Sequence, residues 1–318
     1  MQESPAQFRL GITLAILAAT GFAAKAIFVK LAYRHGVDAI SLLTLRLGYT
    51  LPILGIVWLL RGGERGAPLT WRDRGWLILL GLLGYYLSSL FDFLGLQTVS
   101  ASLERMILYL YPTLTVLFSA LLTRTAISRR IWQALPLTYA GIALVMLPEF
   151  QAMQADLAGV LLIVASTVCY ALYLTWSPAV ITRVGAMRFT ELALSVSALA
   201  MLLHFALTRP ISGLAAQPLA VHGWSVLMAL LSTVLPIYAL AAAMRRIGAG
   251  RAAVVGSFGP LLTIMMSMGV LDEHFAPLQW SGVMLVFLGV WLVSRAPRPG
   301  VQPLVSPASQ GGKASKAG

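Results

Sequence analysis

Long uninterrupted apolar runs constrain this chain more than any other feature of its sequence. Hydrophobic residues make up 58% of its 318 residues and charged residues only 11%, a balance unlike that of a water-soluble domain. An apolar run of about 20 residues can cross the hydrocarbon of a bilayer as a helix, which satisfies its own backbone polar groups. The sequence therefore predicts an all-α membrane protein with about ten transmembrane helices. The predicted helices cover residues 10–33, 39–60, 75–97, 100–123, 131–148, 157–182, 188–208, 222–245, 249–271 and 277–295.

Basic residues fall mainly in alternate loops, which predicts the orientation of the bundle. The predicted cytoplasmic segments carry Arg9, Arg61, Arg65, Arg72, Arg74, Arg124, Arg129, Arg130, Arg183, Arg188, Arg245, Arg246, Arg251, Arg295, Arg298, Lys313 and Lys316. The opposite loops hold Arg34 and Arg209 and the acidic residues Glu149, Asp156, Asp272 and Glu273. This pattern predicts a multi-pass protein of the cell inner membrane with both termini in the cytoplasm. Because the net charge of +12 is spread over loops, no nucleic-acid partner is expected.

An internal repeat divides the chain into two halves. Sliding the sequence on itself by 148 positions pairs Gly11 with Gly159, Trp76 with Trp224, Pro112 with Pro260, Thr115 with Thr263, Ser119 with Ser267, Trp132 with Trp280 and Gly141 with Gly289. Each half holds an odd number of predicted helices, so the second half must enter the membrane in the opposite orientation. This is the inverted-repeat architecture of many secondary transporters. The expected domains are two five-helix repeats, 10–148 and 157–295, followed by a disordered cytoplasmic tail, 296–318, that is rich in Pro, Gly, Ser and Ala.

Residues suited to metal, disulfide or enzyme chemistry are scarce. Cys169 is the single cysteine, and the four histidines lie far apart without the spacing of metal ligands. Motifs of the GxxxxGK[ST], HExxH and GxSxG types are missing from the sequence. We therefore expect no cofactor, no metal site and no enzymatic activity, and any transport must be driven by a gradient or by exchange.

Ionisable side chains inside the predicted helices are candidates for function, because a charge in hydrocarbon is costly unless it faces a cavity or a partner. The strongest candidates are Lys25, Arg46, Asp92 and Glu104. Asp92 and Glu104 flank a short turn near Val99, and helix rise places all four charges in the outer half of the membrane. Two interpretations stay open: a site for substrate or a proton, or buried ion pairs that only hold helices together. Lys30 and Arg105 are close enough to helix ends to extend towards the interface.

Hydroxyl-bearing residues form three stripes at helical spacing, which predicts a partly polar cavity. The stripes are Ser166, Tyr170, Tyr173 and Ser177; Glu104, Leu108 and Tyr111; and Tyr85, Ser88 and Asp92. We assign Tyr85, Tyr111, Tyr170 and Tyr173 to the same substrate site. The equivalent prolines Pro112 and Pro260 each remove a helix hydrogen bond, and we expect them to act as hinges.

The end of each half resembles the EamA family of the drug/metabolite transporter superfamily. The resemblance rests on Tyr111-Pro112-Thr113-Leu114 followed by Trp132 and Gly141, and on Gly259-Pro260-Leu261-Leu262 followed by Asp272-Glu273, Trp280 and Gly289. The family usually places a glutamate after the fourth helix of each repeat; Glu273 fits this pattern, but the equivalent position in the first half is Thr125. The resemblance implies a transporter built of two five-helix repeats.

These observations favour a secondary transporter, an exporter or exchanger of small organic metabolites such as amino acids, that works by alternating access. Lys25 and Arg46 would engage an anionic group, while Asp92 or Glu104 would bind a substrate ammonium or a proton. The alternatives are a membrane-embedded enzyme and a polytopic scaffold without transport activity. The expected partners are a small-molecule substrate, the lipid bilayer and a coupling proton, and the chain is expected to be a monomer or a homodimer.

Overall fold

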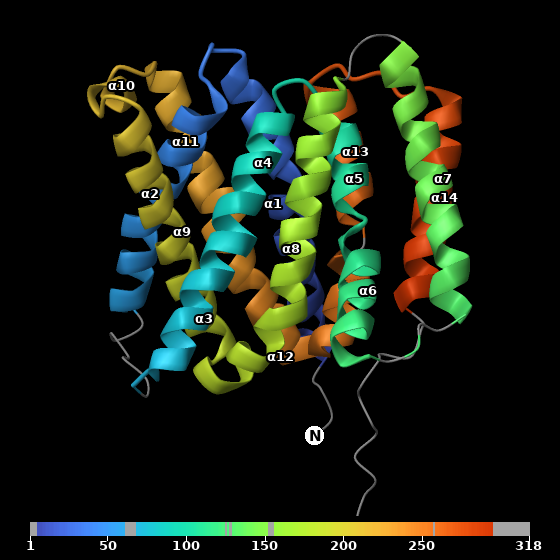
Figure 1. The fold of residues 1–318 in the computed structure, drawn as a ribbon, viewed down its shortest axis with the longest axis horizontal. Helices are drawn as coiled ribbons and strands as arrows, with labels where there is room; N and C mark the ends of the chain where they lie inside the picture. Colours follow the sequence, from blue (N-terminus) through green and yellow to red (C-terminus); the bar gives the residue numbers. More distant parts are fainter. Residues whose placement is uncertain are drawn as a thin grey trace, which may run out of the picture.

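The computed structural model describes residues 5–60, 68–124, 126, 129–151, 156–256 and 258–294, and every regular element within these ranges is helical (Figure 1). The first half contains α1 (Pro5–Tyr33), α2 (Ala39–Leu60), α3 (Trp71–Gly81), the π-helix η1 (Leu82–Leu87), α4 (Ser88–Gly95), α5 (Ala101–Leu108), α6 (Tyr111–Thr123) and α7 (Arg129–Gln151). The second half contains α8 (Leu157–Val184), α9 (Ala186–Thr208), α10 (Ser212–Ala215), α11 (Leu219–Ala229), the π-helix η2 (Leu230–Val234), α12 (Leu235–Gly256), α13 (Gly259–Val270) and α14 (Pro277–Ser294).

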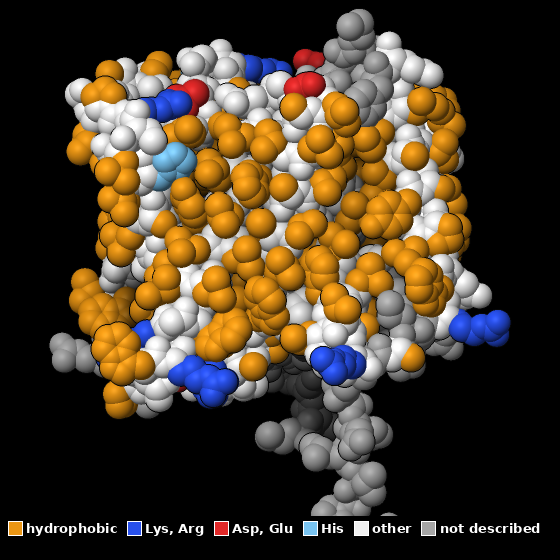
Figure 2. Space-filling view, viewed as in Figure 1, with side chains coloured by type: hydrophobic (Ala, Val, Ile, Leu, Met, Phe, Trp, Pro, Cys, Tyr) orange, Lys and Arg blue, Asp and Glu red, His pale blue; other side chains and the backbone are white. Residues whose placement is uncertain are grey.

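Seven helical stretches within the described residues are long and apolar enough to cross a membrane. They are Gln7–Tyr33, Ala39–Leu60, Trp71–Gly95, Ala101–Thr123, Leu157–Val184, Ala186–Thr208 and Leu219–Gly248. The shorter apolar helices Trp132–Pro148, Gly259–Val270 and Pro277–Leu292 lie where three further spans were predicted. In Figure 2, hydrophobic side chains cover the middle of the visible face, and charged side chains gather along its upper and lower edges. This distribution fits a chain surrounded by lipid; the count of ten spans stays a prediction.

The internal repeat of the sequence is also visible in the backbone. A shift of 148 positions carries α2 onto α9, α5 onto the last turns of α12, and the break before α6 onto the break before α13. It also carries η1, which begins at Leu82, onto η2, which begins at Leu230. Because π-helices are rare and mostly appear as local bulges, their occurrence at equivalent positions is independent support for two related halves.

Contacts between helix ends show that the first helices of the two halves run in opposite directions. At the end of α1, the Tyr33 hydroxyl donates to the carbonyl of Phe93 near the end of α4, at 2.6 Å. At the end of α4, Gly95 packs against Gly159 at the beginning of α8, where an added Cβ on Gly95 would lie 2.8 Å from the Gly159 carbonyl. α1 therefore ends at the face where α8 begins, as Figure 1 also shows.

The two faces of the bundle differ in charge, and we name them accordingly. The acidic face is the one at which α1 ends, and the arginine face is the opposite one. The acidic face holds Asp38, Asp156, Asp272 and Glu273, and the arginine face holds Arg72, Arg74, Arg124, Arg183 and Arg188. An ion pair joins the halves on each face: Arg209 to Asp38 at 2.5 Å on the acidic face, and Arg183 to Asp73 at 2.8 Å on the arginine face.

The last helices of the two halves, α7 and α14, pack directly against each other. Their backbones come so close at Gly141 and Gly282 that a Cβ on either residue would lie 2.5 Å from the other's carbonyl oxygen. Glycine at these two positions therefore permits the contact, since any larger residue would separate the helices.

Several helix boundaries differ from the prediction for local reasons. The third span begins earlier, at Trp71, because the Thr70 side chain caps it by accepting from the Asp73 backbone N–H. The predicted helix 100–123 is two helices, separated at Tyr109 and Leu110. The expected gap between 245 and 249 is a kink at Gly248, whose φ of 79° is accessible to glycine. The predicted tail, 296–318, and Thr125 lie outside the described residues.

Candidate functional site

Three of the predicted charged residues meet in one cluster inside the bundle. The Lys25 ammonium of α1 donates to Asp92 Oδ2 of α4 at 2.6 Å and to Glu104 Oε1 of α5 at 2.9 Å. The side chains of Asp92 and Glu104 are 3% and 0% exposed, whereas that of Lys25 is 16% exposed. We call Lys25, Asp92 and Glu104 the charged triad. One ammonium contacts both carboxylates, so these three groups lie at one level of the bundle, and their depth in the membrane stays a prediction.

The chain path around Val99 brings the two carboxylates together. α4 ends at Gly95, and α5 begins at Ala101 after the N-cap Ser100, whose hydroxyl accepts from the Leu103 N–H. α4 runs up to the turn and α5 runs back from it, so Asp92 and Glu104 each lie about one turn inside the end of its helix. Asp92 Oδ1 and Glu104 Oε2 have no hydrogen-bond partner among the described residues. The triad therefore keeps acceptor atoms that the described side chains leave unused.

Arg105 does not extend towards the interface as predicted. Its Nη2 donates to the Phe22 carbonyl of α1 at 2.8 Å, and its Nε lies 3.9 Å from Glu104 Oε2. The reason is that α5 is short and packed between helices, so its side chains at this level face α1 and the bundle interior. Arg105 thus adds a second positive charge beside the charged triad.

Arg46 lies in the same region of the bundle but makes no ion pair with a described carboxylate. Its Nε and Nη2 donate to Thr233 Oγ1 of η2 at 3.3 and 3.1 Å, and its guanidinium carbon lies 5.4 Å from the centre of the Phe93 ring. Arg46 is 8% exposed, and its Nη1 has no hydrogen-bond partner among the described residues. The buried ion pairs considered for Lys25 or Arg46 are thus made by Lys25 and not by Arg46. It is a buried guanidinium with donor capacity left over.

The four predicted tyrosines form a continuous aromatic chain. Tyr85 and Tyr173 share a hydrogen bond at 3.1 Å, Tyr173 stacks on Tyr170 at 5.7 Å between ring centres, and Tyr170 meets Tyr111 edge to face at 5.4 Å. Gly84 lets this chain form, because a Cβ at that position would overlap the Tyr173 ring.

The predicted stripes face each other across α4 and α8. Ser88 and Ser166 are 3.2 Å apart through their hydroxyls, and the Ser166 hydroxyl also donates to the Ser88 carbonyl at 2.7 Å. The stripes thus contact one another through Ser88 and Ser166 and through the tyrosines, whereas neither of the two cavities described below is lined by these residues.

Pro112 and Pro260 interrupt their helices at equivalent positions, as predicted. Each lies in the first turn of a helix, α6 or α13, and the N-cap residues Leu110 and Phe258 have backbone angles in the right-handed helical region. In that place a proline loses no hydrogen bond that the helix would otherwise make, so the prediction that each proline removes one is wrong. The prolines therefore begin new helices rather than bending continuous ones.

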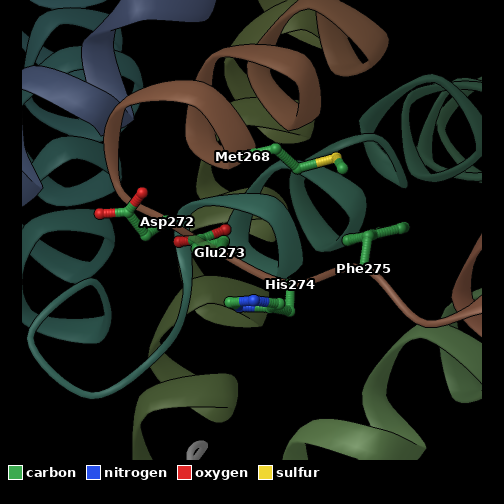
Figure 3. Close-up of a pocket in the computed structure, with 5 residues that line it drawn as sticks. All are labelled: Met268, Asp272, Glu273, His274 and Phe275. Atoms are coloured by element: carbon green, nitrogen blue, oxygen red, sulfur yellow. The ribbon is translucent and has the colours of Figure 1, made fainter.

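Two adjoining cavities open on the acidic face. One, of about 410 Å³, is lined by Lys30, Tyr33, Arg34, Ser100, Leu271 and Glu273. The other, of about 340 Å³, is lined by Met268, Asp272, Glu273, His274 and Phe275 (Figure 3). Glu273 borders both, and Tyr33 connects the first to Phe93, the residue after Asp92, through its hydrogen bond. Among the described residues, no group of three or more His, Cys, Asp or Glu side chains could hold a metal ion.

Comparisons with known proteins agree on the class of protein. The model of the EamA-like transporter family matches twice, at residues 9–147 and 157–295. The uncharacterized transporter YcbK of Bacillus subtilis is 28% identical over 292 residues, which cover 88% of this chain and 92% of that protein. An uncharacterized transporter of Synechocystis sp. is 24% identical, over 76% of this chain and 78% of that protein. A solved crystal structure aligns with a TM-score of 0.57 at 18% identity, over 91% of this chain and 97% of that one, which supports the fold.

Proposed function

The chain belongs to the EamA-like transporter family, and on that premise we propose that this multi-pass membrane protein is a secondary transporter for small organic metabolites that carry both an anionic and a cationic group. The carrying observation is the set of unused polar atoms around the charged triad. Asp92 Oδ1 and Glu104 Oε2 are buried acceptors and Arg46 Nη1 is a buried donor, all without hydrogen-bond partners among the described residues, although Arg105 Nε lies 3.9 Å from Glu104 Oε2. Leaving such atoms unpaired in an apolar interior is costly, so a bound substrate that pairs with them gains that energy.

Each polar group has a defined part in the proposed site. Arg46 and Lys25 engage the anionic group, such as a carboxylate, while Asp92 or Glu104 binds a substrate ammonium or, between substrates, a proton. The aromatic chain of Tyr85, Tyr173, Tyr170 and Tyr111 contacts the apolar part of the molecule. Amino acids and related metabolites have this combination of groups.

The proposed transport cycle is alternating access between inverted halves of five spans each, in the cell inner membrane. Both termini and the arginine face lie in the cytoplasm, as the distribution of positive charge favours. The junctions before Pro112 and Pro260 supply the hinges, with net flux outward or by exchange. Replacing both prolines with alanine should slow transport severalfold and change substrate affinity much less; equal transport rates would argue against the hinges.

Counterflow in proteoliposomes tests the proposed function. Purified protein loaded with one unlabelled amino acid should accumulate the labelled form transiently if that compound is a substrate. Neither an enzyme nor a scaffold exchanges solute in this way. Lack of exchange with amino acids, nucleosides and polyamines, in protein that is folded by thermal unfolding, would contradict the proposal.

Arg46→Lys tests the part assigned to the guanidinium. Lysine keeps the charge but cannot make the forked contact with Thr233 or stack on Phe93 as a planar group. We expect the KM for an anionic substrate to rise about tenfold, equivalent to about 1.4 kcal/mol, with little change in thermal stability. Thr233→Val is the matched control, because it removes the positioning hydroxyl while leaving the guanidinium. An unchanged KM in Arg46→Lys would remove Arg46 from the site.

Asp92→Asn tests proton coupling. If the Asp92 carboxylate carries the proton, the variant should transport at a rate that no longer depends on pH, whereas Asp156→Asn, at the surface of the acidic face, should keep the wild-type profile. A wild-type pH profile in Asp92→Asn would reject Asp92 as the proton carrier.

A further inference from the structure

Glu273 connects the second half of the chain to the helix that carries Glu104. Its Oε1 accepts from the Ala101 backbone N–H at 2.9 Å, and its Oε2 accepts from the Ser102 backbone N–H at 3.2 Å and from the Ser102 hydroxyl at 2.6 Å. The same hydroxyl lies 2.6 Å from that of Ser267 in α13. Together these contacts fasten the first turn of α5 to α13 and the loop that follows it.

The negative charge of the Glu273 carboxylate is well placed beside the first N–H groups of α5. The first N–H groups of a helix have no partner within the helix, and the helix dipole favours a negative charge beside them. Ser102 is 1% exposed, so water competes little for these contacts. Glu273 therefore caps α5 from another part of the chain.

α5 is a short helix bounded by a turn on each side. It has only eight residues, a turn precedes it, and the junction at Tyr109 and Leu110 follows it. Glu104 lies one turn beyond Ser100, at about 6 Å along the helix axis. A tilt of α5 therefore moves the Glu104 carboxylate relative to Lys25.

The cavity of about 410 Å³, which Glu273 borders, lies on the acidic-face side of the charged triad. Its lining residue Ser100 is one turn from Glu104, and Tyr33 reaches the backbone next to Asp92. The residues between are tightly packed: Val29, one turn from Lys25 towards the acidic face, is 0% exposed. The packing of α5 against α1 thus separates the cavity from the charged triad.

We infer that Glu273 is a positioning residue that holds the beginning of α5 in place at the acidic face through its hydrogen bonds to Ala101 and Ser102, which we call the latch. We further infer that release of the latch opens the charged triad to the cavity of about 410 Å³. The inference rests on the proposed transport function, since release of the latch would open the proposed substrate site on one side of the membrane. The arginine face cannot carry the same latch, because positions 125 and 250, equivalent to Glu273 and Ser102, are Thr and Gly. The latch is therefore specific to one side of the membrane.

Thiol accessibility tests the latch. The single cysteine, Cys169, is first replaced by alanine, and Val29→Cys then introduces a probe within the packing that separates the cavity from the charged triad. In cells or oriented vesicles, a membrane-impermeant maleimide is added from the acidic-face side. Glu273→Gln, which removes the charge from the latch, should raise the labelling rate at position 29 about tenfold, equivalent to about 1.4 kcal/mol.

Asp272→Asn is the matched control. It removes the same charge from the neighbouring residue, which lines the cavity of about 340 Å³, and asparagine tolerates the left-handed backbone found there, with φ of 58°. Labelling at position 29 should stay at the wild-type rate. A second probe, Ala243→Cys, tests for a general loosening of the helices, because Ala243 is 0% exposed and lies near the arginine face. Its labelling rate in Glu273→Gln should be the same as with the wild-type glutamate.

The inference is overturned if Glu273→Gln leaves the labelling rate at position 29 unchanged, if Asp272→Asn raises it as much, or if position 243 becomes equally reactive. Labelling needs no substrate, so its outcome is independent of the transport assay. If counterflow fails but Glu273→Gln raises the labelling rate at position 29, only the proposed function is rejected. If counterflow succeeds but Glu273→Gln leaves the labelling rate unchanged, only the latch is rejected.

Discussion

Removing the Lys25 ammonium should destabilise the protein by an amount that the geometry of the charged triad defines. Lys25→Met keeps the length of the side chain but withdraws the donor that lies 2.6 Å from Asp92 and 2.9 Å from Glu104. Both carboxylates then stay buried without their main counter-charge. Breaking a buried ion pair in this way typically costs about 3–5 kcal/mol, and Arg105, at 3.9 Å from Glu104, is too distant to replace the lost contacts.

A neutralised triad should recover most of that loss. In Lys25→Met/Asp92→Asn/Glu104→Gln the uncompensated charges are gone, and replacing a buried ion cluster by neutral groups is often close to neutral in stability. The assay is unfolding by SDS in mixed micelles, followed by tryptophan fluorescence, with the single and triple variants compared with wild type. A loss below about 1 kcal/mol in the single variant, the median for an exposed ion pair, or a triple variant no more stable than the single, would refute a closely coupled, buried cluster.

Two further predictions concern stability. Gly84→Ala should destabilise the protein by about 1–3 kcal/mol, as overpacking does, since its Cβ would overlap the Tyr173 ring. Gly75→Ala is the control, because nothing lies within 4 Å of the added carbon. Equal thermal unfolding temperatures of the two variants would contradict the close contact at Gly84. Burial raises the pKa of Asp38, but hydrogen bonds from Ser41 and Arg209 outweigh this effect and hold that pKa below its usual value. The stabilisation from Asp38 is therefore present above its unfolded-state pKa and lost as pH falls through its folded-state pKa, so thermal unfolding of Asp38→Asn should depend less on pH in the acidic range than that of wild type.

The positions of the charged triad could be predicted from sequence because only helix rise and one turn were needed. Counting residues from the predicted ends of α1, α4 and α5 places three charges at similar depth, and a partly apolar interior then brings opposite charges together. The contacts between the tyrosines follow from stripes with a period of about 3.6 residues on helices that pack against each other, α6 with α8 and η1 with α8.

The partners of Arg46 could not be predicted from periodicity. Thr233 lies in η2, where its hydroxyl donates to the Met228 carbonyl five residues earlier. A π-helical turn inserts extra residues per turn and rotates every later side chain about the helix axis, so a count based on 3.6 residues assigns Thr233 to the wrong face. The repeat offers the one available signal, because Thr233 is the equivalent of Tyr85 in η1.

Glu273 shows a different limit of sequence reasoning. The resemblance to the family singled it out as a glutamate after a helix, but its partners are backbone N–H groups, which every residue has and no motif can mark. A carboxylate at the beginning of a helix is a local signal only when it belongs to that helix; here it comes from another part of the chain, 172 residues away from Ala101.

The repeat gives the charged site an apolar counterpart. Arg46 and Thr233 form a hydrogen-bonded pair. The residues at the equivalent positions, Leu194 and Tyr85, also lie together, in one hydrophobic cluster. The equivalents of Asp92 and Glu104 are Leu240 and Ala252, which likewise belong to one apolar cluster. The backbone therefore repeats the contacts of the site while the side chains change from charged to uncharged. The helices pack at the second location without any charge, which supports the proposal that the charges at the first location serve recognition of a charged substrate.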